Sequence, residues 1–152
     1  WCLIKNHFHF LVYIREEKKV LADSLVYSTV KKKKKLDPSK QFGHLFNAYT
    51  QAINKKYNRT GSLFEKPFER KRVTSEKYLK NLIYYIHNNP VHHGITKSIN
   101  EYTWSSYGSV LSEMPTKLDR EHVIEIFGSV ENFIDYHSQE QDVNSIFDLL
   151  ID

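Results

Sequence analysis

Two pairs of side chains have types and spacings that could perform chemistry on a phosphodiester. His7 and His9 lie one residue apart in an apolar segment, and Tyr85 and Asn89 lie four residues apart in a segment with helical periodicity. Residues four apart on a helix lie one above the other. Imidazole nitrogens and an amide oxygen make a partial coordination shell for a divalent metal, with positions left open for substrate oxygens. A tyrosine beside such a metal can attack phosphorus, so the pattern indicates a phosphodiester-cleaving site.

The elements that must position these side chains are a strand and a helix. Apolar residues alternate through residues 1–14, which predicts a strand with both histidines on its less apolar face. Thr74 or Ser75 is predicted to cap a helix that carries Tyr85 and Asn89, and Pro90 is predicted to end it. The expected buried face of this helix consists of Leu79, Leu82, Ile83 and Ile86.

The rest of the chain supplies further elements. An apolar stripe predicts a helix over residues 39–57, and "NRTG" at 58–61 is expected to end it. Residues 15–38 are expected to form a solvated connection, and 62–73 an extended basic segment. We expect an irregular aromatic segment at 101–110, with Trp104 in the core. Two short amphipathic helices are predicted at 119–137 and 140–151.

The composition is that of a globular protein of 152 residues, with 40% hydrophobic and 26% charged residues. No apolar run approaches the length that crosses a bilayer, and nothing resembles a signal peptide. The single cysteine, Cys2, excludes an intramolecular disulfide and fits a reducing compartment, so we expect a cytoplasmic protein without membrane contact. A net charge of +4 favours polyanionic partners.

Four segments resemble one known family, and they occur in the order expected for it. "NHFHFLV" is similar to the HUH motif, two histidines separated by a bulky hydrophobic residue, of the HUH endonuclease superfamily. "YIHNNPVHHGI" resembles the tyrosine-helix signature of its single-tyrosine transposases, including the REP-associated tyrosine transposases. "YNRTGSLFEKPFERKRV" and "EYTWSSYGSV" also resemble segments of that family. The resemblance covers residues 1–110.

The resemblance implies an α/β (α+β) protein with a ferredoxin-like sheet, helices on one face and short C-terminal helices. It implies a metal-dependent endonuclease and strand transferase that cuts and rejoins single-stranded DNA at hairpin or palindromic ends, as in DNA transposition and recombination. Tyr85 would be the catalytic nucleophile that forms a 5′-phosphotyrosine link. His7, His9 and Asn89 would bind Mg²⁺ or Mn²⁺, and the protein would act as a homodimer.

The sequence departs from the family in two places. Lys5 stands where the family usually has a proline, and the family's first strand and helix precede the HUH strand, so we expect these N-terminal elements to be missing from this chain. The resulting domain prediction is an N-terminally truncated HUH nuclease domain over 1–110 and a helical appendage over 111–152.

The expected DNA contacts are basic residues interleaved with Phe64 and Phe68, a mixture that suits backbone tracking and base stacking on a single strand. These residues are Lys66, Arg70, Lys71 and Arg72. A solvated basic segment is the alternative. The alternatives at the level of function are a non-catalytic DNA-hairpin-binding descendant of the same family and an RNA-processing nuclease that uses the same site.

Overall fold

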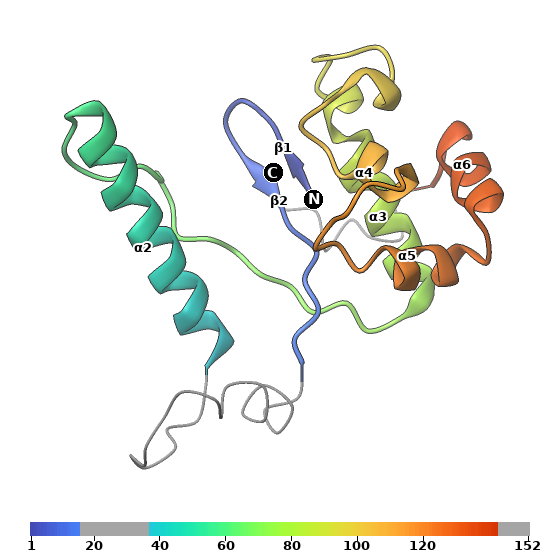
Figure 1. The fold of residues 1–152 in the computed structure, drawn as a ribbon, viewed down its shortest axis with the longest axis horizontal. Helices are drawn as coiled ribbons and strands as arrows, with labels where there is room; N and C mark the ends of the chain where they lie inside the picture. Colours follow the sequence, from blue (N-terminus) through green and yellow to red (C-terminus); the bar gives the residue numbers. More distant parts are fainter. Residues whose placement is uncertain (16–36, 143–152) are drawn as a thin grey trace. The chain divides into compact units, whose positions relative to one another are not determined.

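The computed structural model describes residues 1–15 and 37–142, and within these it is a mixed α and β protein. The chain divides into two compact units, one formed by Trp1–Leu11 with Arg70–Asp152 and the other by Val12–Glu69 (Figure 1). Among the described residues, no helix has both the length and the apolar character needed to span a membrane.

The first unit begins with a short β-hairpin. Strand β1 (Cys2–Leu3) runs antiparallel to β2 (Phe8–His9), with Cys2 opposite His9 and Leu3 opposite Phe8. The Ile4 amide donates to the His7 carbonyl at 2.9 Å and closes the turn. The prediction of one strand over residues 1–14 is therefore wrong, because the chain reverses at Lys5 and Asn6, where the apolar alternation is interrupted. The reversal leaves His7 at the end of the turn and His9 in the strand.

The second edge of β1 pairs with residues 104–106. The Leu3 amide donates to the Trp104 carbonyl at 2.9 Å, and the Ser106 amide donates to the Trp1 carbonyl at 2.9 Å. Tyr102 fixes the same strand by donating its hydroxyl to the Leu3 carbonyl at 2.7 Å. Trp104 contributes its backbone here while its side chain is 63% exposed, so the prediction that it belongs to the core is wrong.

Helix α3 (Glu76–His92) carries Tyr85 and Asn89. Ser75 is its N-cap, because its hydroxyl accepts a hydrogen bond from the Tyr78 amide at 3.2 Å, as the sequence indicates. The prediction that Pro90 ends the helix is wrong. Pro90 lies in the last turn, where its missing N–H removes a single helical bond, and the His93 amide still donates to the Asn89 carbonyl at 3.0 Å.

The C-terminal part of this unit is helical. After the 3₁₀ turn η1 (Ile99–Glu101) come α4 (Tyr107–Leu111), α5 (Arg120–Phe127) and α6 (Val130–Ser138). The single helix predicted over 119–137 is broken because Gly128 adopts a φ of 89°, which ends α5 and redirects the chain into α6. Most of the helix predicted at 140–151 lies outside the described residues, and residues 140–142 are not helical.

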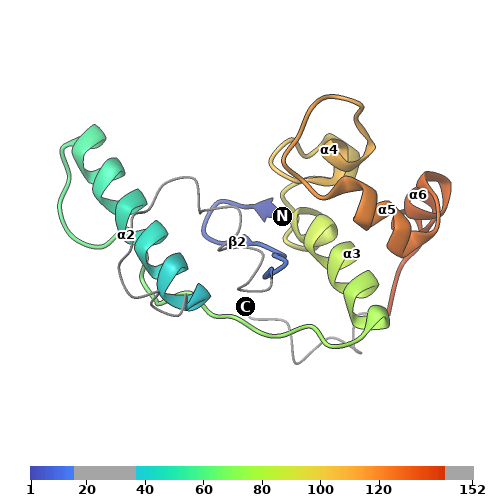
Figure 2. The ribbon, with the colours of Figure 1, turned by 60° about the horizontal axis from the view of Figure 1, so that its bottom comes forward.

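Helix α3 lies between the hairpin and the C-terminal helices, as two views of the fold show (Figures 1 and 2). On one side, Tyr85 and Ile86 pack with Cys2 of the hairpin. On the other side, Ile83 joins a larger cluster with Tyr107, Val110, Phe127 and Phe133. This double contact explains why α3 buries far more of its surface than the stripe predicted from its apolar residues.

The second unit is built around α2 (Pro38–Tyr57), which confirms the helix predicted at 39–57. Asp37 caps it by accepting from the Ser39 amide at 3.0 Å, and Asn58 ends it with a left-handed φ of 49°. Phe42 and Phe46 of this helix pack against Phe64 and Phe68 of the segment that follows, with the Phe46 and Phe68 ring centroids 5.2 Å apart.

A buried pair of histidines links α3 to α6. His137 donates Nδ1–H to the Phe133 carbonyl at 2.7 Å, so its Nε2 accepts the proton of His87 Nδ1 at 3.0 Å. The His87 Nε2 atom lies 2.9 Å from the Ser106 hydroxyl. Burial holds the pKa of His87 well below its usual range and lowers the pKa of His137 to about 4. Both rings are therefore neutral in the folded protein near pH 7.

The neutral pair predicts a loss of stability in mild acid. Below the unfolded-state pKa of about 6.5, the unfolded chain takes up protons that the folded chain does not, so the free energy of unfolding falls by about 2 kcal/mol per histidine between pH 7 and pH 5. Urea denaturation at these two pH values measures the change. His137→Asn should reduce the pH dependence, because it removes one of the two buried histidines. An identical pH dependence in the two proteins would contradict this assignment.

Candidate functional site

The structure brings His9 of β2 and Asn89 of α3 into contact, although 80 positions separate them in the chain. The His9 Nε2 atom and the Asn89 amide nitrogen Nδ2 are 3.4 Å apart. The hairpin and the last two turns of α3 hold the two side chains there, because β1 and α3 pack directly against each other. This pair is the centre of the candidate site.

His7 lies on the same side of the hairpin as His9. Their ring centroids are 5.1 Å apart and the rings meet edge to face. The His7 Nδ1 atom lies 3.1 Å from the side-chain oxygen of Asn6 in the turn. The two histidines that the sequence selects therefore share one face of the hairpin, although they do not belong to one long strand.

Tyr85 lies one helical turn before Asn89 and contacts the same histidine. Its ring centroid is 5.7 Å from that of His9, with the ring planes at 73°. The side chain is only 5% exposed, because it packs with Cys2 and Ile86 in the hairpin-side core. The structure thus gathers the predicted nucleophile and the three predicted metal ligands, and it covers most of the tyrosine ring.

Asn89 has a buried acceptor without a partner. The side chain is 0% exposed, and its Oδ1 atom makes no hydrogen bond within the described residues. A buried polar atom of this kind costs free energy unless it serves another purpose. Rotating the amide by 180° exchanges Oδ1 and Nδ2, which would place the oxygen about 3.4 Å from His9 Nε2. Neighbouring ligands of an octahedral Mg²⁺ at about 2.1 Å are separated by roughly 3 Å, so this pair fits a small hard cation.

The ligand set is small. Within residues 1–15 and 37–142, no three His, Cys, Asp or Glu side chains gather in a way that could hold a metal ion. The available donors are two imidazoles and one amide oxygen, and none of these groups is anionic. Such a set suits an ion that takes its remaining ligands from water and phosphate oxygens.

The four predicted DNA-contacting residues are exposed, and they do not all belong to one unit. Arg70, Lys71 and Arg72 precede α3 in the first unit, whereas Lys66 lies in the second. The neighbouring Phe64 and Phe68 rings are half-buried against Phe46 of α2. Their packing indicates that these two aromatic rings stabilise the second unit, which reduces the surface they could offer to DNA bases.

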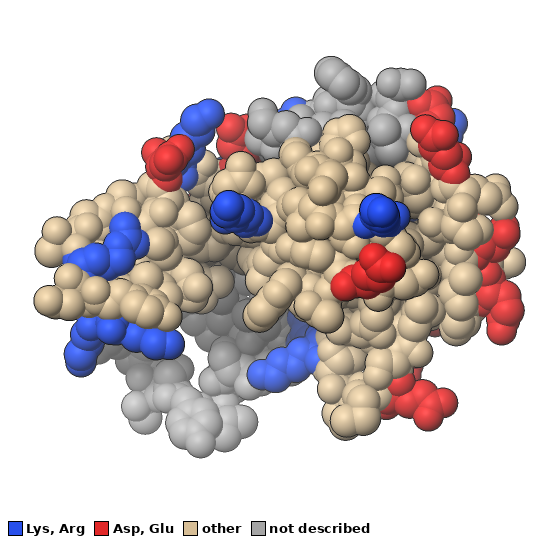
Figure 3. Space-filling model, turned by 90° about the horizontal axis from the view of Figure 1, so that it is seen from above, with Lys and Arg blue, Asp and Glu red and all other residues tan. Residues whose placement is uncertain are grey.

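Charge is distributed very unevenly along the chain. Residues 1–110 contain twenty basic and eight acidic side chains, whereas residues 111–152 contain two basic and ten acidic ones. Acidic side chains recur over the C-terminal helices on the right of Figure 3. A polyanion would be repelled from α5 and α6, so the hairpin and the basic segment before α3 are the more favourable surfaces for it.

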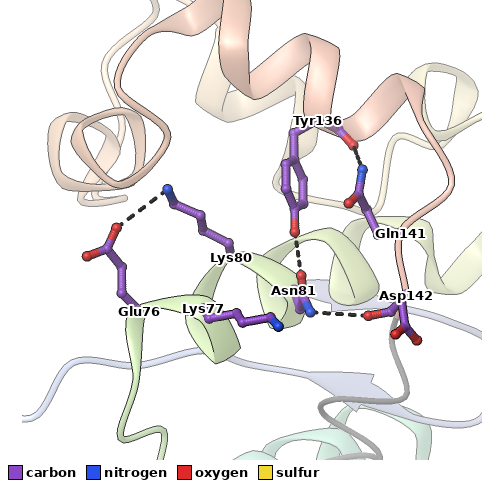
Figure 4. A pocket seen from close by; sticks show the side chains of 7 residues that line it. All are labelled: Glu76, Lys77, Lys80, Asn81, Tyr136, Gln141 and Asp142. Carbon is purple, nitrogen blue, oxygen red and sulfur yellow. Dashed lines mark hydrogen bonds and ion pairs between the residues drawn. The ribbon is translucent and has the colours of Figure 1, made fainter.

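A hollow lies away from the histidines, at the other end of α3. A pocket of about 480 Å³ is lined by Lys77, Lys80 and Asn81 of α3, by Tyr136 of α6, and by Glu76, Gln141 and Asp142 (Figure 4). The Tyr136 hydroxyl donates to the Asn81 side-chain oxygen, and the Asn81 amide donates to the Asp142 carbonyl at 3.2 Å. Because these polar groups form hydrogen bonds with one another, the pocket belongs to a polar contact between α3 and α6.

For His93 the sequence left open a phosphate contact or no role at all, and the structure places this side chain beside the candidate site. The His93 ring, at the C-cap of α3, lies 5.1 Å from the His7 ring, centroid to centroid. Helical spacing alone could not select it, because the cap residue leaves the helical path. Its proximity to the hairpin depends on how the two elements pack.

Comparison of the chain with protein-family models, curated proteins and solved structures gave no match.

Because the Asn89 Oδ1 atom has no hydrogen-bond partner, replacing Asn89 should lower the free energy of unfolding less than replacing another buried residue does. Asn89→Ala should lower the free energy of unfolding by less than about 1 kcal/mol, because the change removes an unsatisfied buried group and improves helix propensity. The neighbouring Ile86→Ala should cost 2–5 kcal/mol, roughly the usual value for a buried aliphatic side chain. Urea denaturation of both variants measures the difference. A cost at Asn89 equal to that at Ile86 would show that Asn89 serves the fold and not a site.

Proposed function

We propose that this protein is a metal-dependent endonuclease and strand transferase of the HUH single-tyrosine transposase type, acting on single-stranded DNA at hairpin or palindromic ends. The observation that carries the proposal is the convergence of Tyr85, His9 and Asn89 from two distant segments, with the Asn89 amide 3.4 Å from His9 and its other polar atom, Oδ1, buried without a hydrogen bond. The four family-like segments quoted above supply the reaction type.

In the proposed reaction, the Tyr85 oxygen attacks the scissile phosphorus. The new P–O bond joins the tyrosine to the 5′-phosphate of the downstream strand, the P–O3′ bond is broken, and the 3′ oxygen of the upstream strand leaves with a proton as a free hydroxyl. The phenolic proton passes to solvent or to a nearby base. Attack by a 3′-hydroxyl on the phosphotyrosine reverses these steps and joins strands, so no bond energy is lost between cleavage and transfer.

His7, His9 and Asn89 are the residues that would hold Mg²⁺ or Mn²⁺. A bound ion would polarise the phosphoryl oxygens and stabilise the charge that develops on them. The chain's own contribution is to fix the ligands: the two-residue hairpin pairing orients His9, and the last helical turns orient Asn89. Preorganised ligands of this kind lower the cost of assembling the site around DNA.

The remaining family properties belong to the same proposal. We infer that β1 and β2 are part of a ferredoxin-like sheet, that residues 1–110 form the nuclease domain with 111–152 as its appendage, and that two copies act together in the cytoplasm. Lys66, Arg70, Lys71 and Arg72 would track the DNA backbone through charge, since all four are exposed.

One observation favours the second candidate, a non-catalytic binder of DNA hairpins. Tyr85 is only 5% exposed, so little of this residue is open to a phosphate. Leu11, which follows β2, packs on the same cluster. A binder needs no access to Tyr85, whereas cleavage does, so the two candidates differ in whether a covalent product forms.

Formation of a covalent adduct tests the proposal. The protein is incubated with labelled DNA hairpins carrying single-stranded flanks, in Mn²⁺ or EDTA, and run on a denaturing gel. We expect a metal-dependent adduct that Tyr85→Phe abolishes. Tyr84→Phe is the matched control, because Tyr84 is equally buried but packs against Tyr136 and His137 on the other side of α3. Bound DNA without an adduct would establish the binder instead.

Metal binding is a separate prediction. His9→Ala and Asn89→Ala should each weaken Mn²⁺ binding by roughly tenfold or more, because each removes one of few ligands. The loss of the free Mn²⁺ signal in electron paramagnetic resonance measures occupancy. His122→Ala removes an exposed imidazole from α5 and should leave binding unchanged. Equal occupancy in all four proteins would overturn the ligand assignment.

A further inference from the structure

Four imidazole rings form a row that ends at the proposed nucleophile. The ring centroids are 5.5 Å apart between His92 and His93, 5.1 Å between His93 and His7, and 5.1 Å between His7 and His9. The last ring is 5.7 Å from that of Tyr85. The outer two, His92 and His93, are exposed, so the row leads from solvent to the candidate site.

The C-terminal end of α3 places His93 at this position. His93 is the C-cap residue, and its amide donates to the Asn89 carbonyl at 3.0 Å. The Gly94 amide donates to the Val91 carbonyl at 2.9 Å and the Ile95 amide to the Pro90 carbonyl at 2.8 Å. These bonds satisfy the carbonyls of the last turn. The backbone carbonyls at the C-terminal end of α3 are therefore already hydrogen-bonded at the point where the His93 ring meets the hairpin.

The row has the chemistry of a phosphate contact. Within the described residues no three of these rings converge as metal ligands, so His93 is not an additional ligand of a three-histidine site. An imidazole keeps at least one N–H donor in every protonation state. Successive phosphates of one DNA strand are spaced by about 3.4 Å or more along its axis, so a phosphate next to the scissile one falls within the length of the row.

We propose that His93 is a phosphate-binding residue that donates an imidazole N–H to a non-bridging oxygen of the phosphate adjacent to the scissile one. The proposal rests on the proposed function, since it takes the position of the scissile phosphate from Tyr85, His9 and Asn89. It assigns His93 a positioning role, which aligns the strand beside Tyr85 without touching the bond that breaks.

The test measures DNA binding without chemistry. Proteins with the Tyr85→Phe background are titrated in EDTA, by fluorescence anisotropy, onto a labelled DNA hairpin with single-stranded thymidine flanks. His93→Leu should weaken binding roughly tenfold or more, the value of one hydrogen bond to a charged group, and His93→Gln should restore it to within about twofold because glutamine keeps an N–H donor. His122→Leu is the control for loss of an exposed histidine elsewhere.

A second probe separates phosphate contact from base stacking. In this hairpin the flank phosphates are replaced by uncharged methylphosphonates, which lack the anionic oxygen. The difference between His93 and His93→Leu should then shrink, because the one phosphoryl oxygen that remains is a neutral and weaker acceptor. A difference of undiminished size would show that the ring stacks on a base, and an unchanged affinity in His93→Leu on the first probe, or no binding of that probe by the Tyr85→Phe protein that retains His93, would also overturn the proposal. Because Tyr85 is already phenylalanine, failure of the adduct experiment leaves this result standing.

Discussion

The structure of the first unit depends on the burial of α3 on two opposite sides. One side of α3 packs against a hairpin whose strands pair over only two residues, and the other side packs against three short helices. A helix in that position buries more than one apolar stripe, and α3 buries Asn81, His87 and Asn89 along with its apolar residues. Each buried polar group needs a partner, and the partners differ. Asn81 and His87 bond to the C-terminal helices and the segments beside them, whereas Asn89 has only its amide nitrogen beside His9 and keeps its oxygen without a partner.

The buried polar residues of α3 therefore differ in role, because some support the fold and Asn89 belongs to the candidate site. His87 and Asn89 are two positions apart and both are buried, yet His87 belongs to a network with Ser106 and His137 that joins the core. Asn89 faces a pair of histidines on the hairpin and keeps an acceptor unused. The charge distribution agrees with this difference between the two sides of α3, because the acidic C-terminal helices pack on the side opposite the hairpin. The proposed DNA-facing side and the supporting side of α3 thus have different electrostatic character.

The sequence could predict elements with strong local signals but not the contacts between them. The two long helices were predictable because apolar periodicity and capping residues at Asp37 and Ser75 are local. The hairpin was not, since the reversal at Lys5 and Asn6 depends on pairing of β1 with residues 104–106 on its other edge. Helical spacing brought Tyr85 and Asn89 together, and only the fold could bring His93 to His7. The burial of Tyr85 was equally unpredictable, because it comes from the hairpin packing across the helix edge.

The central claim is that Tyr85, among the ten tyrosines of this chain, becomes linked to DNA. Tandem mass spectrometry of protein incubated with DNA hairpins and Mn²⁺, then digested with protease and nuclease, locates that link directly. We expect a nucleotide mass on the Tyr85 side chain in the peptide that contains Tyr84 and Tyr85, with fragment ions that assign it to the second of them. A nucleotide on any other residue, or unmodified peptide after full occupancy by DNA and metal, would contradict it.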